Sequence, residues 1–252
     1  MNMCLQRTNG DYGVKNMDTR NYNRRYASEY GWPRTIFYRV FLFLVVWTVS
    51  KLQYCIKIVG RENLERGKQY LYTANHTSYL DPPFVSLAAD ETIAYMAKQE
   101  LFDEKNWLLS SVVKILGAFA VNREKPELAT FKTVFDIRKN TRWSLGIFPE
   151  GQIRSTGVIE NIQKGFITIA KKAKLDIVPV GIKGFDGYAG KKLFQKHITA
   201  TIGKPISYEL SDDEILQEWA RQICEYTGYE NKACFALHDQ EHENEAEKVE
   251  AQ

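Results

Sequence analysis

Short apolar runs alternate with longer amphipathic segments between residues 54 and 226, and this alternation constrains the fold more than any other feature of the sequence. The apolar runs predict strands over 54–59, 69–74, 144–148, 177–182 and 197–202. The amphipathic segments predict helices over 83–89, 107–116, 126–140, 162–174 and 211–226. Strands that alternate with helices build a sheet with helices packed on it. We therefore predict an α/β fold with a mixed, mostly parallel sheet flanked by helices.

Two of these helices begin with a specific signal. Pro126 suits the first turn of a helix, and the neighbouring Glu127 lies near the positive end of the helix dipole. Ser211 and Glu214 have the spacing of a capping box, in which each side chain bonds to the main chain of the other residue. Both signals place helix starts at these positions.

A separate apolar segment covers residues 36–49 and contains Arg39. A membrane-spanning helix needs about 20 mostly apolar residues, and this segment has only about 14. Segments of this length occur as buried core helices, interfacial helices or re-entrant ones. Because Trp32, Tyr38 and Trp47 suit a membrane interface, we predict a helix that inserts shallowly into a membrane. A buried core helix is the alternative.

Charge is distributed unevenly along the 252 residues. Residues 1–51 carry a net charge of +5, residues 52–208 carry +8, and residues 209–252 carry −10. The positive charge of residues 1–208 favours binding to an anionic surface or an anionic substrate. Residues 1–31 are either a solvated arm or a surface-binding one that uses Arg20, Arg24 and Arg25.

Several common sites lack their sequence signals. The cysteines at positions 4, 55, 224 and 234 form no CxxC pair, so we expect neither a zinc site nor a disulfide framework, and a reducing compartment fits best. No GxSxG elbow indicates a serine hydrolase, and no GxGxxG follows a strand. The N-terminus lacks the apolar run of a secretory signal. We therefore expect no metal and no bound cofactor.

The segment from Asn75 to Pro83, NHTSYLDPP, follows the predicted strand over 69–74. His76 and Asp81 would be about 140° apart on a helix, and the following proline disfavours a helical conformation at Asp81. We therefore expect the two side chains to meet across a turn. A histidine held in this way accepts a proton through its other nitrogen, while the carboxylate fixes its tautomer. The alternative is a loop histidine beside a helix-capping aspartate.

A second segment, Phe148-Pro149-Glu150-Gly151, comes at the end of the predicted strand over 144–148, and Arg154 follows closely. Sites in α/β sheets lie outside the carboxyl ends of strands, so this position favours a functional role. The alternative is a strand-ending turn with a solvated glutamate and a surface arginine.

These two segments, in this order and about 70 residues apart, resemble the glycerophospholipid acyltransferase family. The resemblance covers about residues 54–207 and includes Gly60–Leu64, Lys98, Gly117–Arg123, residues 178–180 and Ile202–Ile206. The chain departs from the family pattern at Ala120, where the family more often has a bulky residue or proline, and in the spacing before Arg154. Two residues separate Gly151 from Arg154, where the family commonly has one.

The resemblance implies an enzyme that transfers a fatty acyl group from an acyl thioester to the sn-2 hydroxyl group of a 1-acyl-glycerol 3-phosphate, giving phosphatidic acid. It implies that His76 is the general base and that Asp81 orients it. Backbone amides near the two motif turns are the candidate oxyanion donors.

The resemblance also implies where the acceptor binds. Lys98, Arg123 and Arg154 are the expected cradle for its phosphate, since cationic side chains match phosphate oxygens. Glu150 is expected to hold the glycerol part or to fix neighbouring loops, and Gly151 to allow close approach of the backbone to the ligand.

Composition and the resemblance together predict an organisation in four parts. A flexible basic arm covers residues 1–31, a membrane-interacting helix 32–51, the acyltransferase catalytic domain 52–227, and an acidic flexible tail 228–252. The implied partners are membrane lipid, lysophosphatidate and a donor that is either acyl-CoA or acyl carrier protein, with no nucleic acid. The implied location is a membrane surface facing the cytoplasm.

Two alternatives stay open at this point. The acceptor can be glycerol 3-phosphate or a lysophospholipid with a head group. In an alternative from another class, the protein is a non-catalytic lipid-binding membrane scaffold, and His76 and Asp81 are a structural pair.

Overall fold

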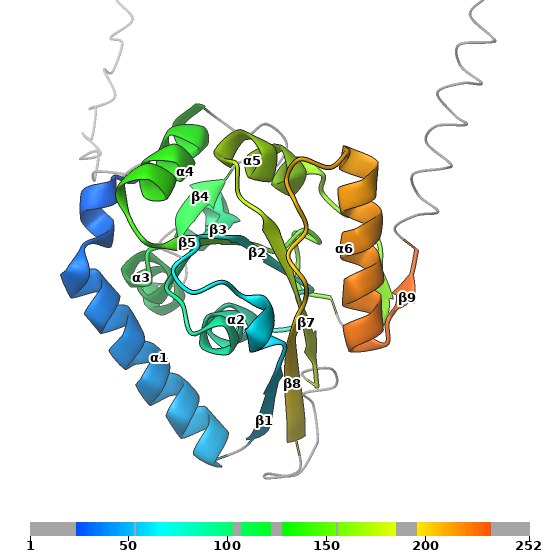
Figure 1. The fold of residues 1–252 in the computed structure, drawn as a ribbon. Helices are drawn as coiled ribbons and strands as arrows, with labels where there is room; N and C mark the ends of the chain where they lie inside the picture. The colour runs from blue at the N-terminus through cyan, green and yellow to red at the C-terminus, as the bar shows by residue number, and fades with distance from the viewer. Residues whose placement is uncertain are drawn as a thin grey trace, which may run out of the picture.

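The computed structural model describes residues 24–52, 54–102, 107–121, 128–154, 156–184 and 196–232, and helices alternate with strands along them (Figure 1). The strands are β1 (Tyr54–Val59), β2 (Leu71–Ala74), β3 (Ile93–Lys98), β4 (Phe119–Val121), β5 (Ser144–Ile147), β6 (Val158–Ile159), β7 (Ile177–Lys183), β8 (Lys196–Ile202) and β9 (Glu230–Asn231). The α-helices are α1 (Trp32–Leu52), α2 (Asp81–Ala89), α3 (Trp107–Ile115), α4 (Leu128–Asn140), α5 (Gly165–Ala173) and α6 (Asp212–Thr227). The 3₁₀ helices among the described residues are η1 (Ala27–Tyr30), η2 (Arg61–Asn63) and η3 (Gln99–Phe102).

Seven strands form one sheet in the order β1-β8-β7-β2-β5-β3-β4. The β7–β8 pair is antiparallel, and the other pairs are parallel. The prediction of a mixed, mostly parallel sheet is thus confirmed. Since β2, β5 and β3 lie side by side and run in the same direction, the loops that follow them meet at one edge of the sheet.

Helices cover both faces of this sheet (Figure 1). Successive side chains of a strand point to opposite faces, so each strand contributes to a hydrophobic cluster on either side. On β2, Tyr72 packs in the cluster that contains Phe84 of α2, whereas Leu71 packs in the cluster that contains Trp219 of α6. The indole Nε1 of Trp219 also donates to Thr73 Oγ1 at 2.8 Å. The strand that leads to His76 is therefore buried on both sides.

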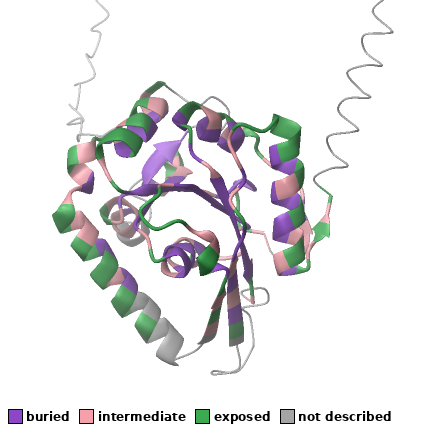
Figure 2. Cartoon of the chain, viewed as in Figure 1, coloured by how far each residue is buried: buried purple, intermediate pink, exposed green. Residues whose placement is uncertain are grey.

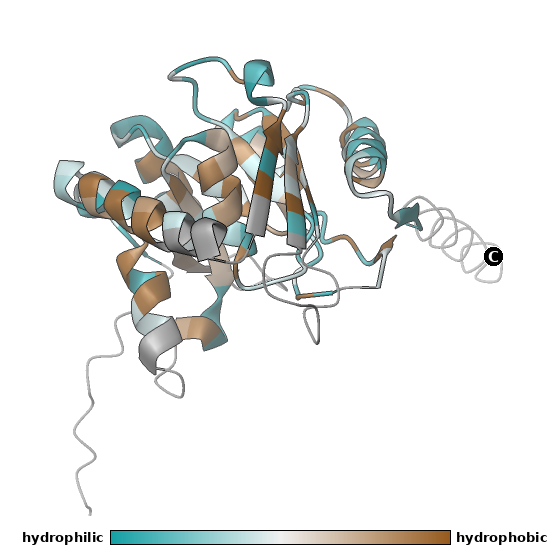
Figure 3. Ribbon diagram, turned by 90° about the horizontal axis from the view of Figure 1, so that it is seen from below, coloured by the Kyte–Doolittle hydropathy of each residue, from teal (hydrophilic) through white to brown (hydrophobic). Residues whose placement is uncertain are grey.

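The helix α1 has a buried side and an exposed apolar side (Figures 2 and 3). Tyr38 is 2% exposed, and its hydroxyl group is within hydrogen-bond distance of Ser86 Oγ at 2.7 Å and donates to the carbonyl oxygen of Ile93. The exposed large apolar side chains of α1 are Trp32, Ile36, Phe37, Val40, Phe43, Leu44 and Trp47. In the described part of the chain, no helix is sufficiently long and apolar to span a bilayer.

Residues 24–31, which we assigned to the flexible arm, pack on the body of the protein. Arg25 is 2% exposed, and its Nη2 donates to the carbonyl oxygen of Lys114 at 2.8 Å. Tyr30 is buried, and its hydroxyl group donates to the carbonyl oxygen of Gly117. The prediction of a flexible, solvated arm is therefore wrong for residues 24–31. The alternative of surface binding is wrong for Arg25, because its guanidinium group is buried in the protein. The predicted flexible tail begins too early at residue 228, because Glu230–Asn231 form β9 and pair with β6. Arg20 and residues 233–252 lie outside the described residues.

Most predicted helices and strands begin and end within a few residues of the predicted limits, and the strands β3, β4, β6 and β9 were not predicted. The capping box of α6 is confirmed, with Glu214 N donating to Ser211 Oγ and Ser211 N donating to Glu214 Oε2. Pro126 lies outside the described residues. The expectation that Pro82 keeps Asp81 out of a helix is wrong. The first turn of a helix needs no N–H group from the proline, so α2 begins at Asp81.

Candidate active site

The two sequence motifs meet at the carboxyl edge of the sheet. The His76 loop follows β2, and the Glu150 turn follows β5, which pairs with β2 in parallel. Asn75, which is fully buried, anchors the first loop. Its side chain donates to the carbonyl oxygen of Ile182 and accepts from Ile182 N, as a neighbouring strand would do.

His76 and Asp81 face each other across the turn between β2 and α2, as predicted. His76 Nδ1 lies 2.8 Å from Asp81 Oδ2, and this oxygen also accepts from the main-chain N–H groups of Thr77 and Ser78. Asp81 is fully buried. Burial raises the pKa of Asp81, while the hydrogen bonds from His76, Ser78 and Thr77 lower it. Since Nδ1 donates to the carboxylate, Nε2 is the nitrogen that is left to accept a proton.

The imidazole ring is also fixed from the β5 side. The ring of Phe148 stacks on the ring of His76 with 4.2 Å between the centroids. The main-chain N–H group of Gly151 donates to the carbonyl oxygen of Phe148, and Gly151 has a φ of 70°. A left-handed conformation of this kind favours glycine, so the turn explains Gly151.

The side chain of Glu150 is hydrogen-bonded to the main chain of the His76 loop. The glutamate is 6% exposed, and its Oε1 accepts from His76 N at 3.4 Å. Burial raises the pKa of Glu150 to about 7, although the hydrogen bond from His76 and the charge of Arg154 lower it. Of the two roles expected for this residue, the contact supports the fixing of a neighbouring loop.

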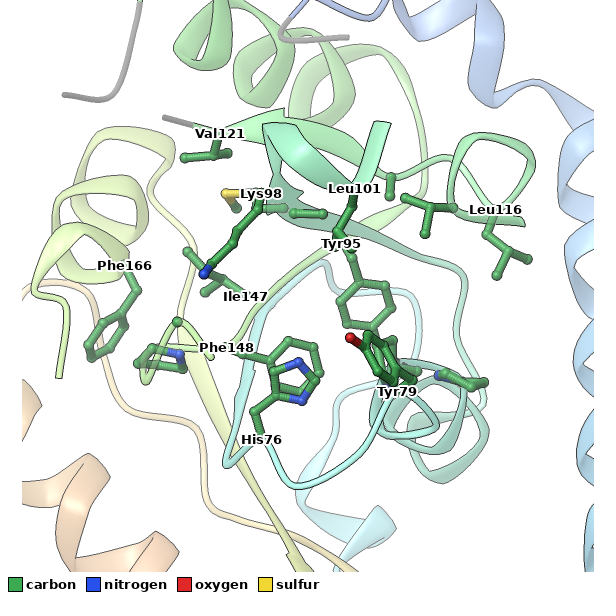
Figure 4. A pocket seen from close by; sticks show the side chains of 18 of the residues that line it. His76, Tyr79, Tyr95, Lys98, Leu101, Leu116, Val121, Ile147, Phe148 and Phe166 are labelled. Carbon is green, nitrogen blue, oxygen red and sulfur yellow. Dashed lines mark hydrogen bonds between the residues drawn. The ribbon is translucent and has the colours of Figure 1, made fainter. Parts of the chain in front are cut away.

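A cavity of about 360 Å³ opens beside the imidazole ring (Figure 4). Its lining includes His76, Phe148, Pro149 and Gly151 from the two motifs. The remaining wall is mostly apolar and includes Phe41 of α1, Val113 and Leu116 near α3, Val121 of β4, and Phe166 and Ile169 of α5. An apolar wall next to a polar reaction centre suits a ligand with a hydrocarbon chain and a polar end.

The three expected phosphate-binding residues have three different outcomes. Lys98, at the end of β3, lines the cavity and is the only lysine or arginine among the described residues that do so. Arg154 lies beside His76, because its main-chain N–H group donates to the carbonyl oxygen of His76 at 2.7 Å. Its guanidinium group forms an ion pair with Glu160, with 2.6 Å between Nη1 and Oε1. Arg123 lies outside the described residues.

The backbone amides of the two turns are largely committed within the protein. The N–H groups of residues 76, 77, 78, 151 and 154 all donate to acceptors of this chain. The expectation that these turns supply free oxyanion donors is therefore wrong for these five amides. The reason is that the turns use them to hold Asp81, Glu150 and each other in place.

Tyr95 is a site residue that the sequence did not reveal. Its hydroxyl group donates to the carbonyl oxygen of Pro82 at 2.8 Å and lies 3.0 Å from Ser86 Oγ. Its ring stacks near that of Phe148, and it lines the cavity. Tyr95 therefore holds the start of α2, and with it Asp81. Nothing in the local sequence distinguishes it from an ordinary core tyrosine.

Comparison with known proteins identifies the family. A family model described as Acyltransferase matches residues 55–183, about half of the chain. The chain belongs to the acyltransferase family. A 1-acyl-sn-glycerol-3-phosphate acyltransferase of Bacillus subtilis (strain 168) is 33% identical over 153 residues, which cover 60% of this chain and 73% of the relative. Another, from Streptococcus pneumoniae (strain ATCC BAA-255 / R6), is 30% identical over 164 residues, which cover 63% of this chain and 59% of the relative.

A solved structure supports the acyltransferase fold. The crystal structure of the 1-acyl-sn-glycerophosphate acyltransferase from Thermotoga maritima matches with a TM-score of 0.50 and 23% identity. The match covers 67% of this chain and 68% of that one. Every site residue discussed above except Phe41 lies within the range that the acyltransferase family model matches. The helix α1, by contrast, lies outside that range.

Proposed function

We propose that the protein transfers a fatty acyl group from an acyl thioester to the sn-2 hydroxyl group of 1-acyl-sn-glycerol 3-phosphate, which forms phosphatidic acid. The observation that carries this proposal is the His76 ring, whose Nδ1 is held by the buried Asp81 while the ring lines an apolar cavity next to Lys98. A general base, a site for a hydrocarbon chain and a positive charge thus lie together. The names of the relatives agree with this acceptor.

The reaction needs no acyl-enzyme. His76 Nε2 removes the proton of the acceptor hydroxyl group as its oxygen attacks the carbonyl carbon of the thioester. Asp81 stabilises the imidazolium ion that forms. When the tetrahedral intermediate collapses, the carbon–sulfur bond breaks, and the imidazolium ion returns the proton to the leaving thiolate. The donor is acyl-CoA or acyl carrier protein, and no bound cofactor is required.

Substitution of Lys98 tests the acceptor assignment, because its charge lines the cavity in which the acceptor phosphate is proposed to bind. Charge-assisted hydrogen bonds contribute about 1.5–3 kcal/mol, so Lys98→Ala is expected to raise the KM for lysophosphatidate about 10- to 100-fold. The KM for uncharged monoacylglycerol should change little. Initial rates with a radiolabelled acyl thioester and both acceptors measure this difference. Lys57→Ala, on the exposed side of β1, is the matched control.

Three outcomes oppose the assignment. Equal losses with both acceptors would remove Lys98 from the phosphate site. Faster transfer to glycerol 3-phosphate or to a lysophospholipid with a head group would assign another acceptor. A wild-type protein that transfers to none of these acceptors would favour the lipid-binding scaffold.

We also propose that α1 docks the protein on the cytoplasmic surface of a membrane. The exposed apolar side of α1 is the supporting observation, because water contact with so many large apolar side chains on one helix is unfavourable. Phe41, between these side chains and the buried side, lines the cavity. A docked α1 therefore brings the cavity close to the lipid phase, where both the acceptor and its product are dissolved. Basic residues of the body add attraction to anionic lipid.

Substitution on the exposed side of α1 tests this docking. The double variant Phe43→Ser with Trp47→Ser should reduce cosedimentation with vesicles of phosphatidylcholine and phosphatidylglycerol by about tenfold or more. Leu128→Ser, which changes a 72% exposed residue of α4, is the matched control and should leave binding unchanged. Undiminished binding of the double variant would exclude α1 as the docking helix. Deletion of α1 is unsuitable, because it would also remove the buried Tyr38.

A further inference from the structure

The guanidinium group of Arg154 is already occupied within the protein. Nη1 pairs with Glu160 Oε1 at 2.6 Å, and the Arg154 side chain is 20% exposed. With the amide of Gln152 turned so that its oxygen faces the guanidinium group, that oxygen accepts from Nε at 2.9 Å and also from Nη2. The phosphate of the lysophosphatidate substrate could therefore bind this arginine only by replacing the side-chain oxygen of Glu160 or of Gln152.

Glu160 is built into this position. It follows β6, which pairs with β9, and Lys232 N donates to the carbonyl oxygen of Ile159 immediately before it. On the other side, Gln163 N donates to the carbonyl oxygen of Pro149 in the turn that carries Glu150. Hydrogen bonds thus fix the segment with Glu160 to the β6–β9 pair and to the active-site turn. These contacts hold the carboxylate next to Arg154.

We propose that Glu160 is an intramolecular competitor that occupies the Arg154 part of the acceptor-phosphate site. The acceptor's phosphomonoester displaces the carboxylate, because it carries a charge of about −1.5 to −2 at neutral pH against −1 for the glutamate. After transfer, the carboxylate returns to Arg154 and promotes release of the product, which carries the same phosphate. This inference rests on the proposed function and on the expected contact of Arg154 with the acceptor phosphate. It assigns Glu160 a role in the balance between acceptor binding and product release.

The displacement has a limited energetic cost. An ion pair with partly exposed members changes an affinity by about fivefold at most. The competitor therefore weakens phosphate binding by a small factor without preventing it. A glutamine at position 160 keeps the shape and a hydrogen-bond acceptor but removes the competing charge.

Kinetics of Glu160→Gln test the proposal. The KM for lysophosphatidate should fall about two- to fivefold, and a short-chain phosphatidate should inhibit more strongly by a similar factor. The KM for uncharged monoacylglycerol should stay unchanged, since this acceptor has no phosphate to seat. In an Arg154→Ala background, the same substitution should have no effect on lysophosphatidate. Glu225→Gln, which removes an exposed partner of Arg221 on α6, is the matched control.

An unchanged or raised KM for lysophosphatidate in a folded, active Glu160→Gln protein would overturn the proposal, as would an equal change with monoacylglycerol. Calorimetric binding of short-chain lysophosphatidate separates this failure from failure of the proposed function. If no variant transfers acyl groups, tighter binding by Glu160→Gln would still support the competition, and equal binding would overturn it.

Discussion

Replacing His76 with alanine is expected to lower kcat by about 10²–10⁴-fold, because it removes the general base from the acceptor hydroxyl group. The fold should persist. The contacts that His76 makes to Glu150 and Arg154 use main-chain atoms, and these remain in the variant. Among the described residues, the substitution removes the ring contact with Phe148, the hydrogen bond to Asp81 and part of the cavity wall. Transfer of a radiolabelled acyl group to lysophosphatidate gives kcat, and thermal unfolding monitors the fold.

His197 provides the control for this experiment. It is an exposed residue of β8, and His197→Ala should leave both kcat and thermal stability unchanged. Near-normal turnover by His76→Ala would contradict the assignment of the base. The imidazole would then be only part of the turn that joins β2 to α2.

Replacing Asp81 with asparagine is expected to lower kcat by about 10²–10³-fold while the loop stays in place. The asparagine oxygen can occupy the position of Oδ2, which accepts from Nδ1 of His76 and from two main-chain N–H groups. Its amide group then replaces Oδ1, which is buried and has no partner among the described residues. The negative charge beside the imidazolium ion is lost. At an effective dielectric constant of 20, such a pair attracts by about 4 kcal/mol.

The same assay compares Asp81→Asn with Asp81→Ala, which also loses the orienting hydrogen bond and should be slower still. Asp90→Asn is the matched control, because Asp90 is exposed at the end of α2 in a left-handed conformation that asparagine tolerates. Wild-type turnover by Asp81→Asn would show that the charge of Asp81 plays no part in the reaction.

The contact between His76 and Asp81 could be predicted because it is local. Five residues separate the two side chains, and a turn is the one conformation of so short a segment that brings them together. The positions of both motifs at strand ends were also predictable from the apolar runs that precede them. The strand that ends at Lys98 was not, since a short apolar run has no periodicity that distinguishes a strand from a buried helix.

The surroundings of Arg154 could not be predicted either. Its ion pair with Glu160 depends on a loop that β9, near the end of the described chain, holds in place. The same holds for Tyr95, whose hydroxyl group reaches the start of α2 only because β3 and β5 are neighbours. The helix α1 is an intermediate case. Its apolar composition was evident, but its division into a buried and an exposed side follows from packing against α2 and β1.

The amino-acid sequence by itself determined the class of fold, the contact between His76 and Asp81 and the strand ends that carry both motifs. These features depend on residue spacing and on interactions between residues close together in the chain. The tertiary structure alone decided that β2, β5 and β3 are adjacent, that an apolar cavity with a lysine opens beside the imidazole ring, and that a glutamate occupies the guanidinium group of Arg154. These features depend on pairings between distant segments, whose order in the sheet is set by the burial of both its faces.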